Sequence, residues 1–418
     1  MQANLFYVEQ ALKNHRKFFK YLALFAFVVI GYFTVYRAAW SPTERTDYTV
    51  YLAAGQAVLD GVNIYEVQSA RGWNYVYPPP FALLLPIFAL MPKILGAIIW
   101  YLLSVFSILA GIEMSVRMLE MATNRSYDRH VLYAWVLILL AVVLVGGTMR
   151  CQASEFMIAL IIGAFYFYFK KNLPLSALCL SAAILLKVFP ITLLAYFFIR
   201  KQWKLMVYVF AGLFFLGWVI PSIFWGVDQN IAYIHDWFKI VAGPVLQSRN
   251  GRTDSVLFTQ LLDTAKPRNQ SLEALLLTLG VYAEYTKYYV VVIALSMLGV
   301  LWLLSRKTLS AAQELLLCSG FIIWHLIIPP ISEGHYFGVL IMPLTILLGL
   351  LMYFRDVQLQ NFLQYKNHTN IITLVVLMAM ILMNFNSTEL MRPLCIASLL
   401  LYFFSTYYIK HSQKFKRV

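Results

Sequence analysis

Two ionisable residues of this 418-residue chain lie where an apolar sequence seldom places a charge. Asp47 is near the start of a polar stretch that ends at Pro80, and Lys187 lies inside the apolar segment 173–199. A carboxylate held beside a substrate hydroxyl can remove its proton while a new bond forms. An ammonium group within an apolar segment is a suitable partner for an anion such as a phosphate. The pair therefore suggests acid–base chemistry on an anionic substrate.

Both residues also have a structural interpretation. Asp47 precedes the segment 48–59, which has helical spacing, and Asp is a favoured N-cap because its carboxylate accepts the unpaired N–H groups of a first turn. The spacing favours neither role over the other. Lys187 could extend its ammonium to the membrane interface. Its position beside Phe189 and Pro190 instead favours a cation that lines a cavity.

Three further candidates lie in other polar segments. In the segment 247–255, Arg249 and Arg252 stand among hydroxyl and amide side chains, and a solvated loop is the structural alternative to a phosphate-binding role. His335 lies at the start of an apolar segment, two residues after Glu333. A single histidine is most often structural, but at this position it could hydrogen-bond a phosphate or orient a hydroxyl.

The composition predicts an all-α, polytopic membrane protein. Hydrophobic residues make up 61% of the chain and charged residues 12%, and the mean hydropathy is +0.71. Apolar runs close to the roughly twenty residues needed to cross a bilayer recur from end to end. They are continuous rather than alternating, which excludes an outer-membrane barrel. The four cysteines show neither a disulfide framework nor a metal-ligand spacing, so no metal or cofactor is expected.

We expect about twelve membrane-spanning helices, with both termini in the cytoplasm because the first span follows a basic flank. The predicted spans are 21–33 extending towards 40, a span within 81–114 broken near Pro86 and Pro92, 131–147, 156–169, two short helices within 173–199 that meet at Lys187, 205–224, 288–304, 315–328, 336–352, 371–383 and 394–408. With this topology the outer segments carry as many acidic as basic residues. The whole net charge of +14 then lies on the cytoplasmic side, and nucleic acid is not needed as a partner.

The polar segments predict two external loops within one integral membrane domain, 1–418. In the first loop, 41–80, a short amphipathic helix at 48–59 should lie in the interface plane and end at Asp60-Gly61, and Tyr77 to Pro80 should be extended. The second and larger loop covers 225–287. The residues that we expect to contact substrate are Tyr48, Tyr51, Tyr65, Tyr77 and Glu333.

Three motifs follow one another along the chain. The first comprises Asp47-x-x-Val50-Tyr51 with Ala54, Gly61-x-x-Ile64-Tyr65 and Tyr75-x-Tyr77-Pro78-Pro79. The second comprises Leu186-Lys187-Val188-Phe189-Pro190 and the basic turn Arg200-Lys201-Gln202-Trp203. The third comprises Pro330-Ile331-Ser332-Glu333-Gly334-His335-Tyr336 with Pro343. In their order and shared side, the motifs resemble glycosyltransferase family 87, the polyprenol-phosphate-mannose-dependent mannosyltransferases of the GT-C fold.

The resemblance implies an inverting transfer of a hexose, with mannose as the expected sugar, from a polyprenyl-phosphate-linked donor to a glycan or glycolipid acceptor. It places the reaction at the periplasmic or outer face of the inner (plasma) membrane. It implies that Asp47 is the general base, and that Lys187, His335 and Arg249 or Arg252 hold the donor phosphate. Cations there would stabilise the negative charge that develops on the leaving group. The expected partners are the lipid-linked donor, the acceptor and membrane lipid.

The chain departs from the family pattern at two places, and two other functions stay open. Arg252-Thr253-Asp254-Ser255-Val256-Leu257 stands where the family often has Asn-x-Ser-Leu, and Gly334-His335-Tyr336 stands where it often has paired aromatic or histidine residues. Both departures concern donor or acceptor preference. A transporter or flippase of a lipid-linked or anionic substrate is one alternative, although no clear internal repeat is present. Another GT-C-like enzyme, an aminosugar transferase or a glycan ligase, is the other.

Overall fold

The computed structural model describes residues 14–41, 46–70, 72–241, 268–358 and 392–411. Every regular element within these residues is a helix, apart from two isolated β-bridges, Gln68–Asn74 and Asn269–Glu333. The chain forms two compact units, each made from separate stretches of sequence. The first unit contains 1–27, 109–144 and 267–418, and the second contains 28–108 and 145–266. The predicted single domain of 1–418 stays a prediction.

The predicted all-α, polytopic membrane class is confirmed. Six helices within the described residues are long and apolar enough to cross a bilayer. They are α2 (Arg16–Val35) continued by η1 (Tyr36–Trp40), α6 (Lys93–Thr123), α12 (Trp203–Phe214) continued by η3 (Phe215–Val219) and α13 (Ile220–Trp225), α18 (Ala283–Ser305), η4 (Gly334–Leu340) with α20 (Ile341–Gln358), and α22 (Pro393–His411). The pair α7 (Arg129–Leu139) and α8 (Ala141–Thr148) is a possible broken span. The count of twelve stays a prediction, and the span at 371–383 lies outside the described residues.

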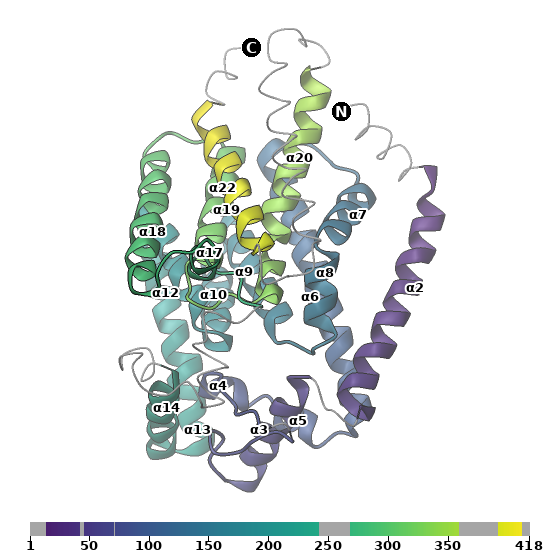
Figure 1. The fold of residues 1–418 in the computed structure, drawn as a ribbon, viewed down its shortest axis with the longest axis vertical. Coiled ribbons are helices and arrows are strands. Elements are labelled where there is room, and N and C mark those ends of the chain that lie inside the picture. The colour runs from purple at the N-terminus through teal and green to yellow at the C-terminus, as the bar shows by residue number, and fades with distance from the viewer. Residues whose placement is uncertain (1–13, 42–45, 71, 242–267, 359–391, 412–418) are drawn as a thin grey trace. The chain divides into compact units, whose positions relative to one another are not determined.

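In the second unit, the segment predicted as the first external loop is folded around a short helix. Its helix α3 (Tyr48–Asp60) ends at Gly61, whose φ of 67° is left-handed, as the Asp60-Gly61 stop signal predicted. Figure 1 shows α3 beside α4 (Pro79–Ala82) and α5 (Pro86–Ala89). A Cβ atom on Gly55 would lie 2.6 Å from the backbone oxygen of Leu85, so the absence of a side chain allows α3 to approach α5 closely.

The prediction that Tyr77 to Pro80 is extended is wrong for its second half. Pro78 has ψ of 150° and is extended, but Pro79 and Pro80 form the first turn of α4. Proline is tolerated there because the N–H groups of a first turn have no partner within the helix. The predicted breaks near Pro86 and Pro92 are confirmed, since α5 begins at Pro86 and α6 begins after Pro92.

The break at Lys187 lies between two helical segments of the second unit. The helix α10 (Leu173–Leu186) packs between α9 (Ser154–Phe169) and α12, and Ser176 and Ser181 donate side-chain hydrogen bonds of 2.7 and 2.9 Å to backbone oxygens of α9 and α12. Lys187 has extended backbone angles and ends α10. The chain continues as η2 (Phe189–Leu193) and α11 (Leu194–Ile199). The predicted break of 173–199 at Lys187 is confirmed.

In the large external loop, α14 (Val227–Val241) lies against the first loop within the second unit. Tyr233 donates its hydroxyl to the backbone oxygen of Val62 at 3.3 Å, and Trp237 donates Nε1 to that of Val76 at 3.3 Å. The rest of this loop up to residue 267 lies outside the described residues. The two predicted external loops are therefore in contact.

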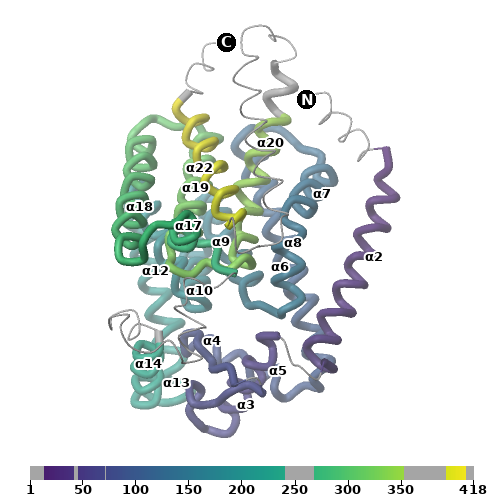
Figure 2. The backbone as a smooth tube through the Cα atoms, in the orientation of Figure 1, coloured from purple at the N-terminus to yellow at the C-terminus, as the bar shows by residue number. Residues whose placement is uncertain are grey.

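The first unit is a helical bundle with capped ends. Ser310 and Gln313 form a capping box at the start of α19 (Ala311–Ile327), and Ser271 caps the short helix α17 (Leu272–Thr278). The helix α22 packs along α19, and Figure 2 shows this pair in yellow and green. Tyr402 of α22 donates its hydroxyl to the backbone oxygen of Met297 in α18 at 2.6 Å. These contacts link the end of the described chain to helices about one hundred residues earlier.

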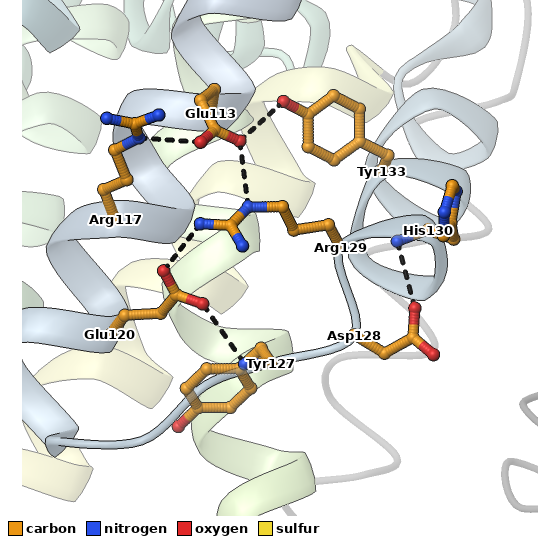
Figure 3. Close-up of polar contacts among 8 residues, drawn as sticks. All are labelled: Glu113, Arg117, Glu120, Tyr127, Asp128, Arg129, His130 and Tyr133. Carbon is orange, nitrogen blue, oxygen red and sulfur yellow. Dashed lines mark hydrogen bonds and ion pairs between the residues drawn. The ribbon is translucent and has the colours of Figure 1, made fainter.

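An ion-pair network joins α6 to α7 within the first unit (Figure 3). Glu113 accepts hydrogen bonds from Arg117 at 2.7 Å, Arg129 at 3.2 Å and Tyr133 at 3.0 Å. Arg129 also donates to Glu120 at 2.9 Å. Because Arg129 lies at the first position of α7, the network fixes where this helix begins relative to α6.

Candidate active site

The carboxylate of Asp47 does not cap α3. Asp47 has helical backbone angles, and its side chain makes no capping hydrogen bond. Its Oδ2 instead accepts a hydrogen bond of 2.6 Å from Nε2 of Gln152 and a longer contact of 3.5 Å from the hydroxyl of Tyr77. The backbone N–H of Asp47 donates to the backbone oxygen of Arg150 at 3.0 Å. The half-buried carboxylate is therefore oriented by residues remote in sequence rather than by its own helix.

The ammonium group of Lys187 is held in the same unit. The residue is only 8% exposed, and Nζ donates a hydrogen bond of 2.8 Å to Oγ of Ser154. Nζ also lies 5.5 Å from the centre of the Tyr77 ring, a distance at which a cation is attracted to an aromatic face. Tyr77 thus contacts Asp47 through its hydroxyl and Lys187 through its ring. The structure brings these three predicted residues together.

A turn between α8 and α9 supplies the partners of both charged groups, and sequence reasoning missed it. Along this turn, Gln152 binds Asp47, the backbone N–H of Ala153 donates to the hydroxyl of Tyr51 at 3.2 Å, and Ser154 binds Lys187. The turn forms because Cys151 adopts a left-handed φ of 53°, which is uncommon for a residue other than glycine. Several polar residues between two apolar segments on the predicted outer side were the available signal.

The tyrosines of the first loop form a buried aromatic cluster. Tyr48 and Tyr51 are fully buried and Tyr65 is nearly so. The hydroxyl of Tyr65 donates to the backbone oxygen of Tyr77 at 2.9 Å, and Tyr51 stacks on Trp100 with ring centres 4.9 Å apart. The structure therefore gives Tyr48, Tyr51 and Tyr65 a role in packing the loop. Tyr77 is 8% exposed and packs in the same cluster, and the substrate contact predicted for Tyr48, Tyr51, Tyr65 and Tyr77 stays a prediction.

Tyr51 and Tyr77 extend the hydrogen bonding around the base. Their hydroxyl oxygens are 2.8 Å apart. Burial, followed by the charge of Asp47, raises the pKa of Tyr51 well above its ordinary value, so its hydroxyl stays protonated. Since Tyr51 accepts from the N–H of Ala153 and Tyr77 donates to Asp47, the proton of Tyr51 points to Tyr77. A directed chain of hydrogen bonds thus ends at the carboxylate.

Two other predicted residues, Glu333 and His335, lie in the first unit. Nδ1 of His335 is 3.6 Å from Oε2 of Glu333, and the His335 ring packs edge-on against Tyr336. His335 is buried in η4. The roles predicted for Glu333 and His335 stay predictions. Arg249 and Arg252 lie outside the described residues.

The segment that precedes His335 is fixed by a polar cluster in the first unit. Asn269 donates Nδ2 to the backbone oxygen of Pro330 at 2.8 Å and accepts from the N–H of Ser332 at 2.9 Å. Arg392, which is 4% exposed, donates Nη1 to the backbone oxygen of Asn269 at 2.8 Å. Hydrogen bonds from Asn269 thus hold the backbone of Pro330 and Ser332, the first part of the third motif.

No group of three or more metal-ligating side chains occurs in the described parts of the chain. Around Asp47 the structure thus gathers a half-buried carboxyl group, a tyrosine hydroxyl and the buried ammonium group of Lys187, in a polytopic membrane protein. A comparison with protein families identifies the type of reaction. The model of glycosyltransferase family 87 matches residues 75–330, more than half of the chain, so the chain belongs to glycosyltransferase family 87 and is a membrane glycosyltransferase. Lys187 lies within the matched segment, and Asp47 and His335 lie outside it.

Two solved structures are similar to the chain over most of its length. ArnT from Cupriavidus metallidurans bound to undecaprenyl phosphate is 13% identical, with a TM-score of 0.41, and the match covers 96% of this chain and 78% of that one. The apo state of the same protein is 12% identical, with a TM-score of 0.44 and the same coverage. No curated protein matches the chain.

Proposed function

We propose that this glycosyltransferase moves a hexose, with mannose as the expected sugar, from a polyprenyl-phosphate donor to a hydroxyl of a glycan or glycolipid. Membership of glycosyltransferase family 87 supports the class of reaction. One observation carries the residue roles: Tyr77 contacts Asp47 through its hydroxyl and Lys187 through its ring. A base and a cation that are 140 positions apart in sequence are thus within reach of one side chain.

In the proposed reaction, the oxygen of the acceptor hydroxyl attacks the anomeric carbon of the sugar while the bond from that carbon to the phosphate oxygen breaks. Asp47 takes the hydroxyl proton, and the bonding electrons leave with the polyprenyl phosphate. A single displacement of this kind inverts the anomeric configuration. Lys187 stabilises the negative charge that grows on the leaving phosphate. His335 and Arg249 or Arg252 are proposed as further phosphate ligands, from the family resemblance alone.

We assign the reaction to the outer face of the plasma (inner) membrane. The support is the distribution of basic residues along the sequence, which favours cytoplasmic termini and external loops at 41–80 and 225–287. A GT-C arrangement of the helices is part of the same proposal. The transporter and flippase alternative is not retained, because the family consists of glycosyltransferases.

The test uses the full chain in membranes, incubated with undecaprenyl-phosphate mannose carrying a radiolabel, and follows the label into extracted glycolipid and glycan. Asp47→Asn keeps the size of the side chain but removes the base, so transfer should fall by roughly 10²–10⁴-fold. The matched control is Asp60→Asn, which changes an exposed acid at the other end of α3. It should transfer label at the wild-type rate.

Full transfer by a folded Asp47→Asn protein would remove Asp47 as the base. If the protein transferred sugar from a glucose- or aminosugar-bearing donor and none from the mannose donor, it would still be a glycosyltransferase. The proposal of mannose as the sugar would then be wrong. Folding is checked by the elution of each detergent-solubilised variant as a single species.

A further inference from the structure

A buried acid lies in the first turn of α9, directly after the partners of Asp47 and Lys187, and the proposed mechanism does not use it. Glu155 follows directly after Ser154 and is 2% exposed. Its Oε2 is buried, and none of the described residues forms a hydrogen bond with that atom. Burying a polar group without a partner costs free energy, and burying a charge costs considerably more. The placement of this carboxyl therefore needs a physical explanation.

The surroundings of Glu155 favour its uncharged form. It precedes the apolar stretch 156–169, and among the described residues the titratable groups that interact with it are Asp47, Tyr51, Cys151 and Lys187. Burial raises the pKa of Glu155 to about 8, and the charge of Asp47 acts in the same direction. Its own backbone N–H and Lys187 act in the opposite direction without overcoming burial. At neutral pH, Glu155 is therefore mostly protonated.

The alternative charge state would alter both functional groups. An ionised Glu155 would attract the ammonium of Lys187 and reduce the positive charge available to a phosphate. It would also put a second negative charge near Asp47, where a phosphate must approach. Ser154, which is neutral, instead accepts the hydrogen bond of Lys187 at 2.8 Å. This hydrogen bond holds the ammonium group of Lys187 without adding a negative charge to the turn.

We propose that Glu155 is a positioning residue that acts through Lys187: its neutral carboxyl preserves the positive charge of Lys187 for the phosphate of the lipid-linked substrate. This inference rests on the proposed function, because it requires a phosphate to bind beside Lys187. It adds a condition to that function, which is that substrate binds when Glu155 carries its proton. Loss of that proton releases the substrate.

The test measures binding of undecaprenyl phosphate to the purified full chain in detergent between pH 6.5 and pH 9.5. The wild type should bind at neutral pH and lose roughly tenfold or more in affinity as Glu155 ionises, since the charge of a buried carboxylate acts strongly on that of Lys187. Glu155→Gln has nearly the same shape and cannot ionise. It should bind at neutral pH within about threefold of the wild type and keep its affinity at alkaline pH.

The two proteins see the same ligand and the same Lys187, so the difference between their profiles reports Glu155 alone. The matched control is Glu314→Gln, which neutralises an acid in the first turn of another apolar helix, α19. This control should keep the wild-type pH profile. If Glu155→Gln does not fold, Glu155→Asp replaces it, and the loss of affinity should move to lower pH because Asp is the stronger acid.

Three results would overturn the inference. A folded Glu155→Gln protein that loses affinity at alkaline pH as the wild type does would show that another group titrates. A folded Glu155→Gln protein without affinity at pH 7 would show that an anion is needed at this position. With Glu155→Asp, an unchanged midpoint would exclude this residue as the titrating group. Absence of binding by the wild type at every pH would instead overturn the proposed function, and this inference with it.

Discussion

The side-chain amide of Gln152 donates a hydrogen bond of 2.6 Å to Oδ2 of Asp47, across 105 positions of sequence. This bond orients the carboxylate of Asp47, which makes no capping hydrogen bond to α3. A base must be held close to its working geometry, because small displacements of a reacting group cost large factors in rate. If Asp47 is the base, as proposed, Gln152 is the residue that orients it.

Removing the amide of Gln152 should slow transfer without abolishing it. Hydrogen bonds to charged groups contribute about 1.5–3 kcal/mol, so Gln152→Ala should lower kcat by roughly 10–150-fold. The donor KM should change much less, because the proposed phosphate ligand is Lys187 rather than Gln152. The control is Gln56→Ala, which removes an exposed amide bonded to Asp60 on the same loop. If the two variants had equal kcat values, the hydrogen bond from Gln152 would not be needed for the proposed role of Asp47.

Lys187 should govern binding of the donor. Lys187→Met keeps most of the apolar length of the side chain but removes the charge, so the donor KM should rise by roughly 10²-fold, the loss expected for a charged hydrogen bond to phosphate. Ser154→Ala removes only the acceptor of the 2.8 Å bond, and its KM should rise much less. The control is Lys204→Gln, an exposed cation at the start of α12. If folded Lys187→Met had an unchanged donor KM, Lys187 would not bind the donor phosphate.

Tyr77→Phe tests the link between the two charged groups. The variant keeps the ring near Lys187 but loses the hydroxyl that contacts Tyr51 and Asp47. It should lower kcat by about tenfold at most and destabilise the protein by about 1 kcal/mol, as is typical for one lost hydrogen bond. Tyr402→Phe, which removes a buried hydroxyl bond in the first unit, is the control. If Tyr402→Phe lost as much stability but kept the wild-type kcat, the lower kcat of Tyr77→Phe would be due to its position beside Asp47 rather than to lost stability.

Much of the fold could be predicted from local signals. Gly61 ends α3 because glycine adopts a left-handed φ without strain, and the pair Asp60-Gly61 predicted this end from the sequence. The break in 173–199 was predicted because a single span would have placed the basic cluster at 200–204 on the outer side, and Lys187 and Pro190 marked where the break would lie. The helical start at Pro79 could not be separated from an extended segment, because proline is compatible with both backbone conformations.

The site could be predicted only in part, because its contacts are long-range. Asp47 and Lys187 stand out as charges in an apolar chain, whereas Gln152 and Ser154 are ordinary polar residues until a left-handed turn at Cys151 directs them. A sequence pattern carries no information on which of two roles Asp47 has, since a cap and a base need the same side chain. The structure excludes the capping role, because the carboxylate of Asp47 makes no capping hydrogen bond and instead accepts one from Gln152.

The network around Glu113 should contribute to stability rather than to catalysis. Arg129 bonds to both Glu113 and Glu120, and its side chain is 47% exposed, so salt should screen these contacts. Arg129→Gln should lower the thermal unfolding temperature at low salt and have a smaller effect at high salt. Lys410→Gln, an exposed cation near the end of α22, should leave that temperature unchanged. An equal shift at both salt concentrations would rule out the ion pairs as its cause.

Gly55→Ala should disrupt the layer that carries Asp47. The added Cβ would meet the backbone oxygen of Leu85 at 2.6 Å, and a backbone atom cannot rotate away as a side chain can. Overpacking of this kind costs about 1–3 kcal/mol, so α3 should separate from α5, with a lower unfolding temperature in detergent and a lower transfer rate. Gly299→Ala is the matched control, since nothing lies within 4 Å of its Cβ and alanine favours the interior of α18. If Gly55→Ala unfolded at the wild-type temperature, the close approach of α3 to α5 would not be required. If it also transferred sugar at the wild-type rate, the position of Asp47 would not depend on that contact.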